Sequence, residues 1–222
     1  MRGRTVRAFG STDFEEDEDT MTAVSAPLAP TEAPDHRAGL RMRALAVVAG
    51  GVLFALGNAL HPWEHNEAAL TYPTWVLSHL TFAAGALLIA AGSGALAQRL
   101  APSRVALVGL GLLWLGMVLM PVGAYAEAYV APAVDQDVFA GIEESAAILN
   151  VVYALPVLLG PLLIAFGTLR HRLLPVWVSL ALQGTLIGAV LGPALPKEGY
   201  GIIPGTVVFG FAIAAAGWAA RR

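Results

Sequence analysis

The chain has 222 residues, of which 57% are hydrophobic and 13% charged, and its formal net charge is −3. Soluble domains average about 45–50% apolar and about 25% charged residues, so this chain has too few polar side chains to cover a water-soluble globule. It contains no cysteine, which excludes disulfides, thiolate metal ligands and cysteine nucleophiles.

The first 40 residues form a polar segment that contains an acidic run. The run extends from Asp13 to Asp19, and a stretch rich in alanine, proline and threonine follows as far as Pro34. Such a segment buries too little apolar surface to offset the entropy of ordering it, so we expect residues 1–40 to be a disordered acidic tail in the cytoplasm. An acidic docking tail is the functional alternative, and Met21 is an alternative start.

Six apolar segments follow the tail, and each is long enough to cross a bilayer as a helix, which takes about 20 residues. Only helices and closed barrels satisfy their backbone groups in lipid, and barrel strands are about half this length and alternate in polarity. We therefore predict an all-α, polytopic bundle of six transmembrane helices over residues 41–222. The predicted spans are 42–60, 73–98, 104–126, 145–169, 173–195 and 200–220.

The basic residues predict how the spans are oriented. Six crossings place every arginine on one side, whereas the other side carries Lys197 and acidic residues such as Glu64 and Glu143. Because basic residues are enriched in cytoplasmic segments, both termini are predicted to be cytoplasmic. In an alternative topology, the segment ending near Ala59 is a cleaved signal peptide, which leaves five spans.

Small residues predict where the helices pack. Gly184, Gly188 and Gly192 recur at four-residue spacing and therefore share one face of the fifth span. Lipid gives helices no hydrophobic drive to associate, and small residues let their backbones approach closely. We expect this face to contact another helix of the bundle, and a homo-oligomer interface is the alternative.

Ionisable residues near the outer ends of the spans form the candidate site. His79 lies roughly 9 Å along the second span at 1.5 Å per residue, His61 ends the first span and Glu127 follows the third. Glu143 and Asn150 lie seven residues apart, on one helical face at a similar level. Burying such groups in a membrane is costly, so they are functional candidates.

Imidazole nitrogens and carboxylate oxygens are ligands for zinc and related divalent metals. His61, His79 and Glu127 are therefore predicted as a three-ligand metal site with one open position. The alternatives are binding of another small ligand, or structural bonding of His79 to Asn150 or to a backbone carbonyl. Haem between the two histidines is disfavoured, because a second haem near the other face has only His171 available.

Two further features concern polar and aromatic side chains. Gln183 lies roughly 16 Å along the fifth span from Arg172, where a buried amide predicts an interhelical hydrogen bond, with a substrate contact as the alternative. Aromatic residues near the span ends predict interfacial belts. These residues are Trp63, Trp75, Trp218, Tyr72, Tyr125, Tyr129 and Tyr200.

Three local sequences carry a resemblance. They are the His61–Pro62 exit from the first span, Trp75 with His79 in the second, and the Glu-Ala-Tyr-Val-Ala-Pro run of 127–132. Over residues 42–220 the chain resembles small multi-pass membrane proteins of actinobacteria and other high-GC bacteria. The resemblance implies a bacterial inner membrane and implies no activity.

The motifs of common enzymes do not occur, since the sequence has no Walker, Rossmann or nucleophile-elbow pattern. The basic loops follow from membrane topology and do not indicate nucleic-acid binding. We therefore expect a protein of the lipid bilayer with a binding, regulatory or accessory role. The alternatives are a small transporter for neutral or apolar compounds, and a metal-dependent hydrolase with Glu143 or Glu144 as the base.

Overall fold

The computed structural model describes residues 36–64, 66–192 and 202–221, most of which are helical and none of which lies in a strand. Five helices are long and apolar enough to cross a membrane. They are α1 (His36–Leu60), α2 (Trp75–Leu100), α3 (Arg104–Tyr125), α5 (Ala147–His171) and α8 (Ile202–Ala220). The all-helical architecture predicted from the sequence is therefore confirmed, with five such helices in the described part of the chain.

The segment predicted as the fifth span is an interrupted helix. It consists of α6 (Val176–Ala181) and α7 (Gly184–Leu191), which are separated at Leu182 and Gln183. At the break, the Gln183 side chain donates a hydrogen bond of 2.9 Å to the carbonyl of Pro161 on α5. The interhelical bond predicted for Gln183 is thus present. Residues 193–195, the last of this predicted span, lie outside the described residues.

Other boundaries differ from the prediction by a few residues. Helix α1 begins at His36, so residues 36–40 are helical although they were assigned to the tail; residues 1–35 lie outside the described part. Two short helices occupy loops between spans: η1 (Glu67–Thr71) and α4 (Gln136–Ser145). Helix α3 continues through a π-helical turn, η2 (Ala126–Val130), and a 3-10 turn, η3 (Ala131–Ala133).

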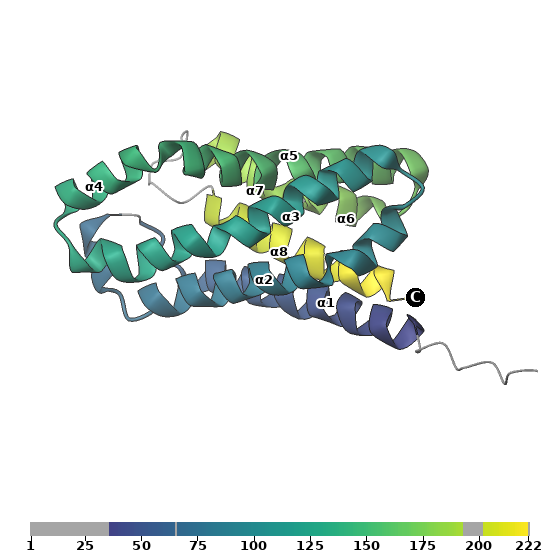
Figure 1. Cartoon of the computed structure of the whole chain (residues 1–222), viewed down its shortest axis with the longest axis horizontal. Helices are drawn as coiled ribbons and strands as arrows, with labels where there is room; N and C mark the ends of the chain where they lie inside the picture. Colours follow the sequence, from purple (N-terminus) through teal and green to yellow (C-terminus); the bar gives the residue numbers. More distant parts are fainter. Residues whose placement is uncertain (1–35, 65, 193–201, 222) are drawn as a thin grey trace, which may run out of the picture. The chain divides into compact units, whose positions relative to one another are not determined.

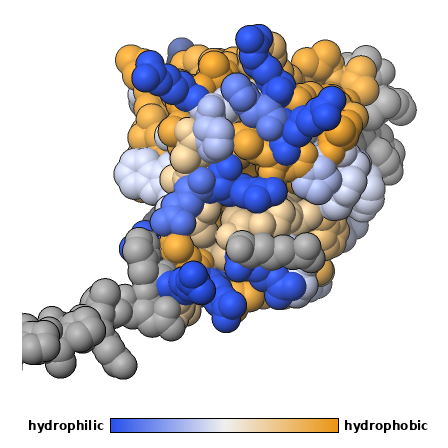
Figure 2. All heavy atoms as spheres, turned by 90° about the vertical axis from the view of Figure 1, so that its right-hand side faces the viewer, coloured by the Kyte–Doolittle hydropathy of each residue, from blue (hydrophilic) through white to orange (hydrophobic). Residues whose placement is uncertain are grey.

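The charged residues of the bundle are separated between its two ends. The start of α1, the α2–α3 and α5–α6 turns and the end of α8 gather at one end, whereas α4 lies at the other (Figure 1). The first end, called the basic end, shows hydrophilic side chains across its face (Figure 2). Its described arginines are Arg37, Arg41, Arg43, Arg99, Arg104, Arg170, Arg172 and Arg221. The opposite, acidic end carries Glu64, Glu67, Glu127, Asp135, Asp137, Glu143 and Glu144.

Glycines bring neighbouring helices into backbone contact. A Cβ atom added to Gly50 of α1 would lie 2.7 Å from the carbonyl oxygen of Gly85 on α2. A Cβ on Gly109 of α3 would lie 2.6 Å from the carbonyl oxygen of Gly160 on α5. Close approach of this kind maximises van der Waals contact, which drives helix association where water is absent.

The glycine face of the interrupted helix packs against α8. A Cβ on Gly184 would meet the carbonyl oxygen of Gly205, and one on Gly205 would lie 3.2 Å from the Cα of Gly188. Gly184 and Gly188 are buried and Gly192 is half-buried. The close helix contact predicted for this face is therefore made within the chain.

The outward faces of the long helices are apolar. Large side chains such as Leu87 on α2, Val108 on α3 and Phe166 on α5 are exposed. Contiguous exposed apolar surface marks a membrane or protein interaction site. Together with the five long apolar helices, it indicates a membrane protein.

Candidate functional site

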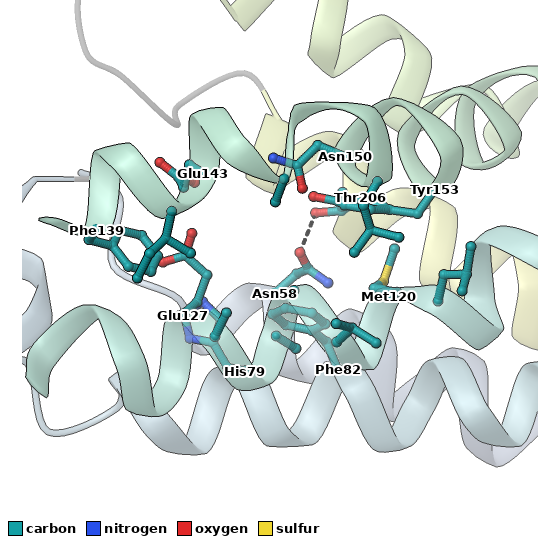
Figure 3. Close-up of a pocket in the computed structure, with 18 of the residues that line it drawn as sticks. Asn58, His79, Phe82, Met120, Glu127, Phe139, Glu143, Asn150, Tyr153 and Thr206 are labelled. Atoms are coloured by element: carbon teal, nitrogen blue, oxygen red, sulfur yellow. Dashed lines mark hydrogen bonds between the residues drawn. The ribbon is translucent and has the colours of Figure 1, made fainter. Parts of the chain in front are cut away.

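A cavity of about 380 Å³ lies at the acidic end, between α1, α2, α3, α4, α5 and α8 (Figure 3). Most of its wall is apolar, and Phe54, Phe82, Met120 and Phe139 contribute large side chains. Its polar lining residues are Asn58, His79, Glu127, Glu143, Asn150, Tyr153 and Thr206. Four of the residues singled out from the sequence thus line one cavity, namely His79, Glu127, Glu143 and Asn150.

His79 is buried in the cavity wall. Its side chain is only 2% exposed, and Nδ1 lies 2.8 Å from the carbonyl oxygen of Trp75, one turn earlier in α2. A carbonyl only accepts, so Nδ1 carries the proton and donates. The ring also packs against Phe82 and His61, with centroids 5.3 and 4.9 Å away. The hydrogen bond from His79 to a backbone carbonyl, which was the structural alternative to metal binding, is therefore observed.

Trp75 joins the start of α2 to the end of α3. Its side chain is 1% exposed, and the indole Nε1–H donates a 2.8 Å hydrogen bond to the backbone carbonyl of Glu127. Its assignment to an interfacial belt is therefore wrong, because the indole polar group bonds inside the protein and not to lipid headgroups. The belt assignment fits Tyr125 and Tyr129 better, since both side chains are exposed.

The π-helical turn η2 sets the position of Glu127. A π turn inserts an extra residue into the helical repeat and shifts the side chains that follow it, and such turns are frequent at functional sites. Here Tyr125 and Tyr129 are exposed, Ala128 is buried, and half-buried Glu127 lines the cavity. The bond from Trp75 holds this turn against α2.

A hydrogen bond between the side chains of Asn58 and Thr206 joins α1 to α8 at the cavity. The Thr206 hydroxyl lies 2.8 Å from Asn58 Oδ1, and Asn58 Nδ2 donates to the Phe54 carbonyl at 2.8 Å (Figure 3). Asn58, Thr206 and Tyr153 were missed by the sequence reasoning. For Asn58 the signal was available, since it precedes His61 by less than one helical turn.

His61 is not among the residues that line the cavity. Its Nδ1 donates to the Pro62 carbonyl at 2.7 Å, and its ring lies against the rings of Trp75 and His79. Within the described ranges, no group of three His, Asp or Glu residues is arranged to hold a metal ion. His61, His79 and Glu127 therefore do not form a three-ligand set here.

Gln183 lies away from this cavity, at the break between α6 and α7. Its Oε1 atom and the Thr185 Oγ1 atom are buried and have no hydrogen-bond partner among the described residues. Polar atoms without a partner are costly in an apolar interior. Two buried polar atoms, one from Gln183 and one from Thr185, therefore lie at or beside the break between α6 and α7, and neither residue lines the cavity.

A smaller cavity of about 80 Å³ adjoins this region and is lined in part by Asn66 and Gln136. Glu127, Phe139 and Glu143 line both cavities. These three side chains therefore lie where the two spaces meet. Two of them carry carboxylates, and of these Glu127 is half-buried and Glu143 is exposed.

The arrangement has the chemistry of a small-molecule pocket. Such pockets are concave and mostly apolar, with a few polar groups that fix the orientation of the ligand. Here the walls are apolar, while two carboxylates, two amides, two hydroxyls and an imidazole supply the polar groups. No protein-family model, curated protein or solved structure matches this chain.

Proposed function

We propose that the protein is a six-span protein of the cytoplasmic membrane that binds a small amphipathic molecule near the outer face. The observation that supports this proposal is the preformed cavity of about 380 Å³, whose apolar walls carry a few polar groups. The separation of arginines from acidic residues favours cytoplasmic termini, and with that orientation the cavity would face the outside. The role is binding, regulatory or accessory.

The orientation is tested by cysteine labelling, because the chain has no cysteine of its own. Glu144 and His171 are both exposed and lie at the acidic and basic ends. In intact cells, a membrane-impermeant maleimide is expected to label Glu144→Cys and not His171→Cys. Permeabilised cells should label both variants. The reverse pattern in intact cells would overturn the proposed orientation.

Ligand binding is tested by photolabelling in nanodiscs of zwitterionic lipid. The probe is a neutral long-chain alcohol with a diazirine, and its crosslinks are mapped by mass spectrometry. We expect labelling of half-buried cavity residues such as Phe82 and Met120 to be suppressed by excess unlabelled alcohol. Labelling of outward residues such as Val108 should rise linearly with probe, because lipid-facing sites do not saturate.

A pair of neighbouring alanines supplies the matched control. Ala146 is half-buried and lines the cavity, whereas Ala147 is exposed and does not. Ala146→Phe is expected to occupy the space and abolish saturable labelling, and Ala147→Phe to leave it unchanged. Equal saturable labelling of both variants would show that the alcohol binds elsewhere.

A further inference from the structure

We propose that the natural occupant of the cavity is an organic cation with an apolar body, such as a long-chain amine. This inference rests on the proposed binding function and adds the charge of the ligand. Glu127 and Glu143 bring two formal negative charges to the lining, and no arginine or lysine is among the described lining residues. The described arginines belong to the basic end of the bundle.

The two carboxylates lie at one side of the cavity, and two of its large apolar side chains lie at the other (Figure 3). Glu127 and Glu143 lie with Phe139 on one side, toward α4, and Phe82 and Met120 lie on the other (Figure 3). The carboxylate side is also the junction with the smaller cavity. A molecule with a charged group at one end and an apolar body at the other matches this division.

An ammonium group fits the carboxylate side better than the other charge classes. It is attracted by both glutamates, whereas an anion placed there would be repelled. The ring of Phe139 lies on this side and offers a cation–π contact (Figure 3). A divalent metal fits less well, because the described residues contain no group of three ligands arranged for one.

Two amides and two hydroxyls, which lie beyond the carboxylates, limit the ligand further. Asn58 and Thr206 bond to each other, and Asn58 also bonds to the Phe54 carbonyl. Asn150 and Tyr153 line the cavity from α5. A ligand with one hydrogen-bonding group near its cationic end meets these side chains before it reaches the apolar wall.

The inference is tested by competition against the neutral photoprobe in the same nanodiscs. The competitors are decyltrimethylammonium, decanol and decanoate, which share a ten-carbon chain and differ in charge. We expect the ammonium compound to suppress labelling at about tenfold lower concentration than the alcohol, a ratio that corresponds to about 1.4 kcal/mol. Decanoate should be the weakest competitor.

Glutamine variants separate the preference of the cavity for the ammonium compound from the partitioning of the competitors into lipid. This partitioning is the same for every variant. Glu127→Gln with Glu143→Gln should bring the ammonium-to-alcohol ratio close to that of lipid partitioning alone. Glu144→Gln is the matched control, because Glu144 neighbours Glu143 but does not line the cavity. Retained saturable labelling by the neutral probe shows that each variant is folded.

The outcomes distinguish the two proposals. Labelling by the neutral probe that does not saturate would overturn the proposed function, and the inference with it. Saturable labelling with a ratio that is equal in wild type and the double variant would overturn only the cationic ligand. An ammonium-to-alcohol ratio that falls in the double variant and stays at the wild-type value in Glu144→Gln supports the cationic ligand.

Discussion

Replacement of Gly85 by alanine is expected to destabilise the bundle by about 1–3 kcal/mol, the usual cost of overpacking a well-packed interior. A Cβ at this position would lie 2.5 Å from the backbone nitrogen of Phe54 and 2.7 Å from the carbonyl oxygen of Gly50. These are backbone atoms of α1, so no side-chain rotation relieves the clash. The two helices must separate, and their contact along the remaining length weakens. Unfolding in a denaturing-detergent titration, followed by circular dichroism, measures the effect.

Gly111→Ala is the matched control, since Gly111 also lies within a long helix but has no atom within 4 Å of an added Cβ. Alanine is the better helix former by about 1 kcal/mol, so this variant should be as stable as the wild type or more stable. Equal losses in both variants would contradict the close approach of α1 and α2.

Substitution of Trp75 by alanine is expected to cost about 3–5 kcal/mol, the range for removing a large buried aromatic side chain. Trp75 is 1% exposed and packs against His61 and His79, with ring centroids 5.3 and 4.5 Å away. Its removal leaves a void beside the candidate cavity and frees the π-helical turn. The same detergent titration measures this loss, with Trp114→Ala as the control because that side chain is 46% exposed.

Trp75→Phe tests the hydrogen bond separately. Phenylalanine keeps most of the ring and removes the donor to the Glu127 carbonyl, which should cost about 1 kcal/mol. Hydrogen exchange of residues 126–133 is then expected to accelerate, while exchange elsewhere changes less. If exchange in this segment stays at the wild-type rate, the indole bond does not hold the turn.

Local sequence determined which segments of this protein are helical and which helix ends are basic. Uninterrupted apolar runs of about 20 residues have few structural solutions in lipid, so their length and composition are sufficient to predict helices. Helical rise also predicts depth, because each residue advances about 1.5 Å along the axis. That count predicted His79, Glu127 and Asn150 at a similar level, and all three line one cavity.

Depth along a helix axis does not determine the direction in which a side chain points. The tertiary structure decided which of these side chains line the cavity. His61 has the predicted depth but packs against Trp75 and His79 and does not line the cavity. Glu127 enters the lining on a π turn, which no apolar pattern reveals.

The same limit explains the interrupted helix and the buried tryptophan. The segment 173–195 has no charged residue, yet its described part breaks where Gln183 donates a hydrogen bond to α5 and Gly184 meets α8. Trp75 is buried, and its indole donates a hydrogen bond to the Glu127 carbonyl beyond the end of α3. Hydropathy and length therefore determined the helices of this protein, whereas contacts between helices determined their breaks, their rotation and the residues that share the cavity.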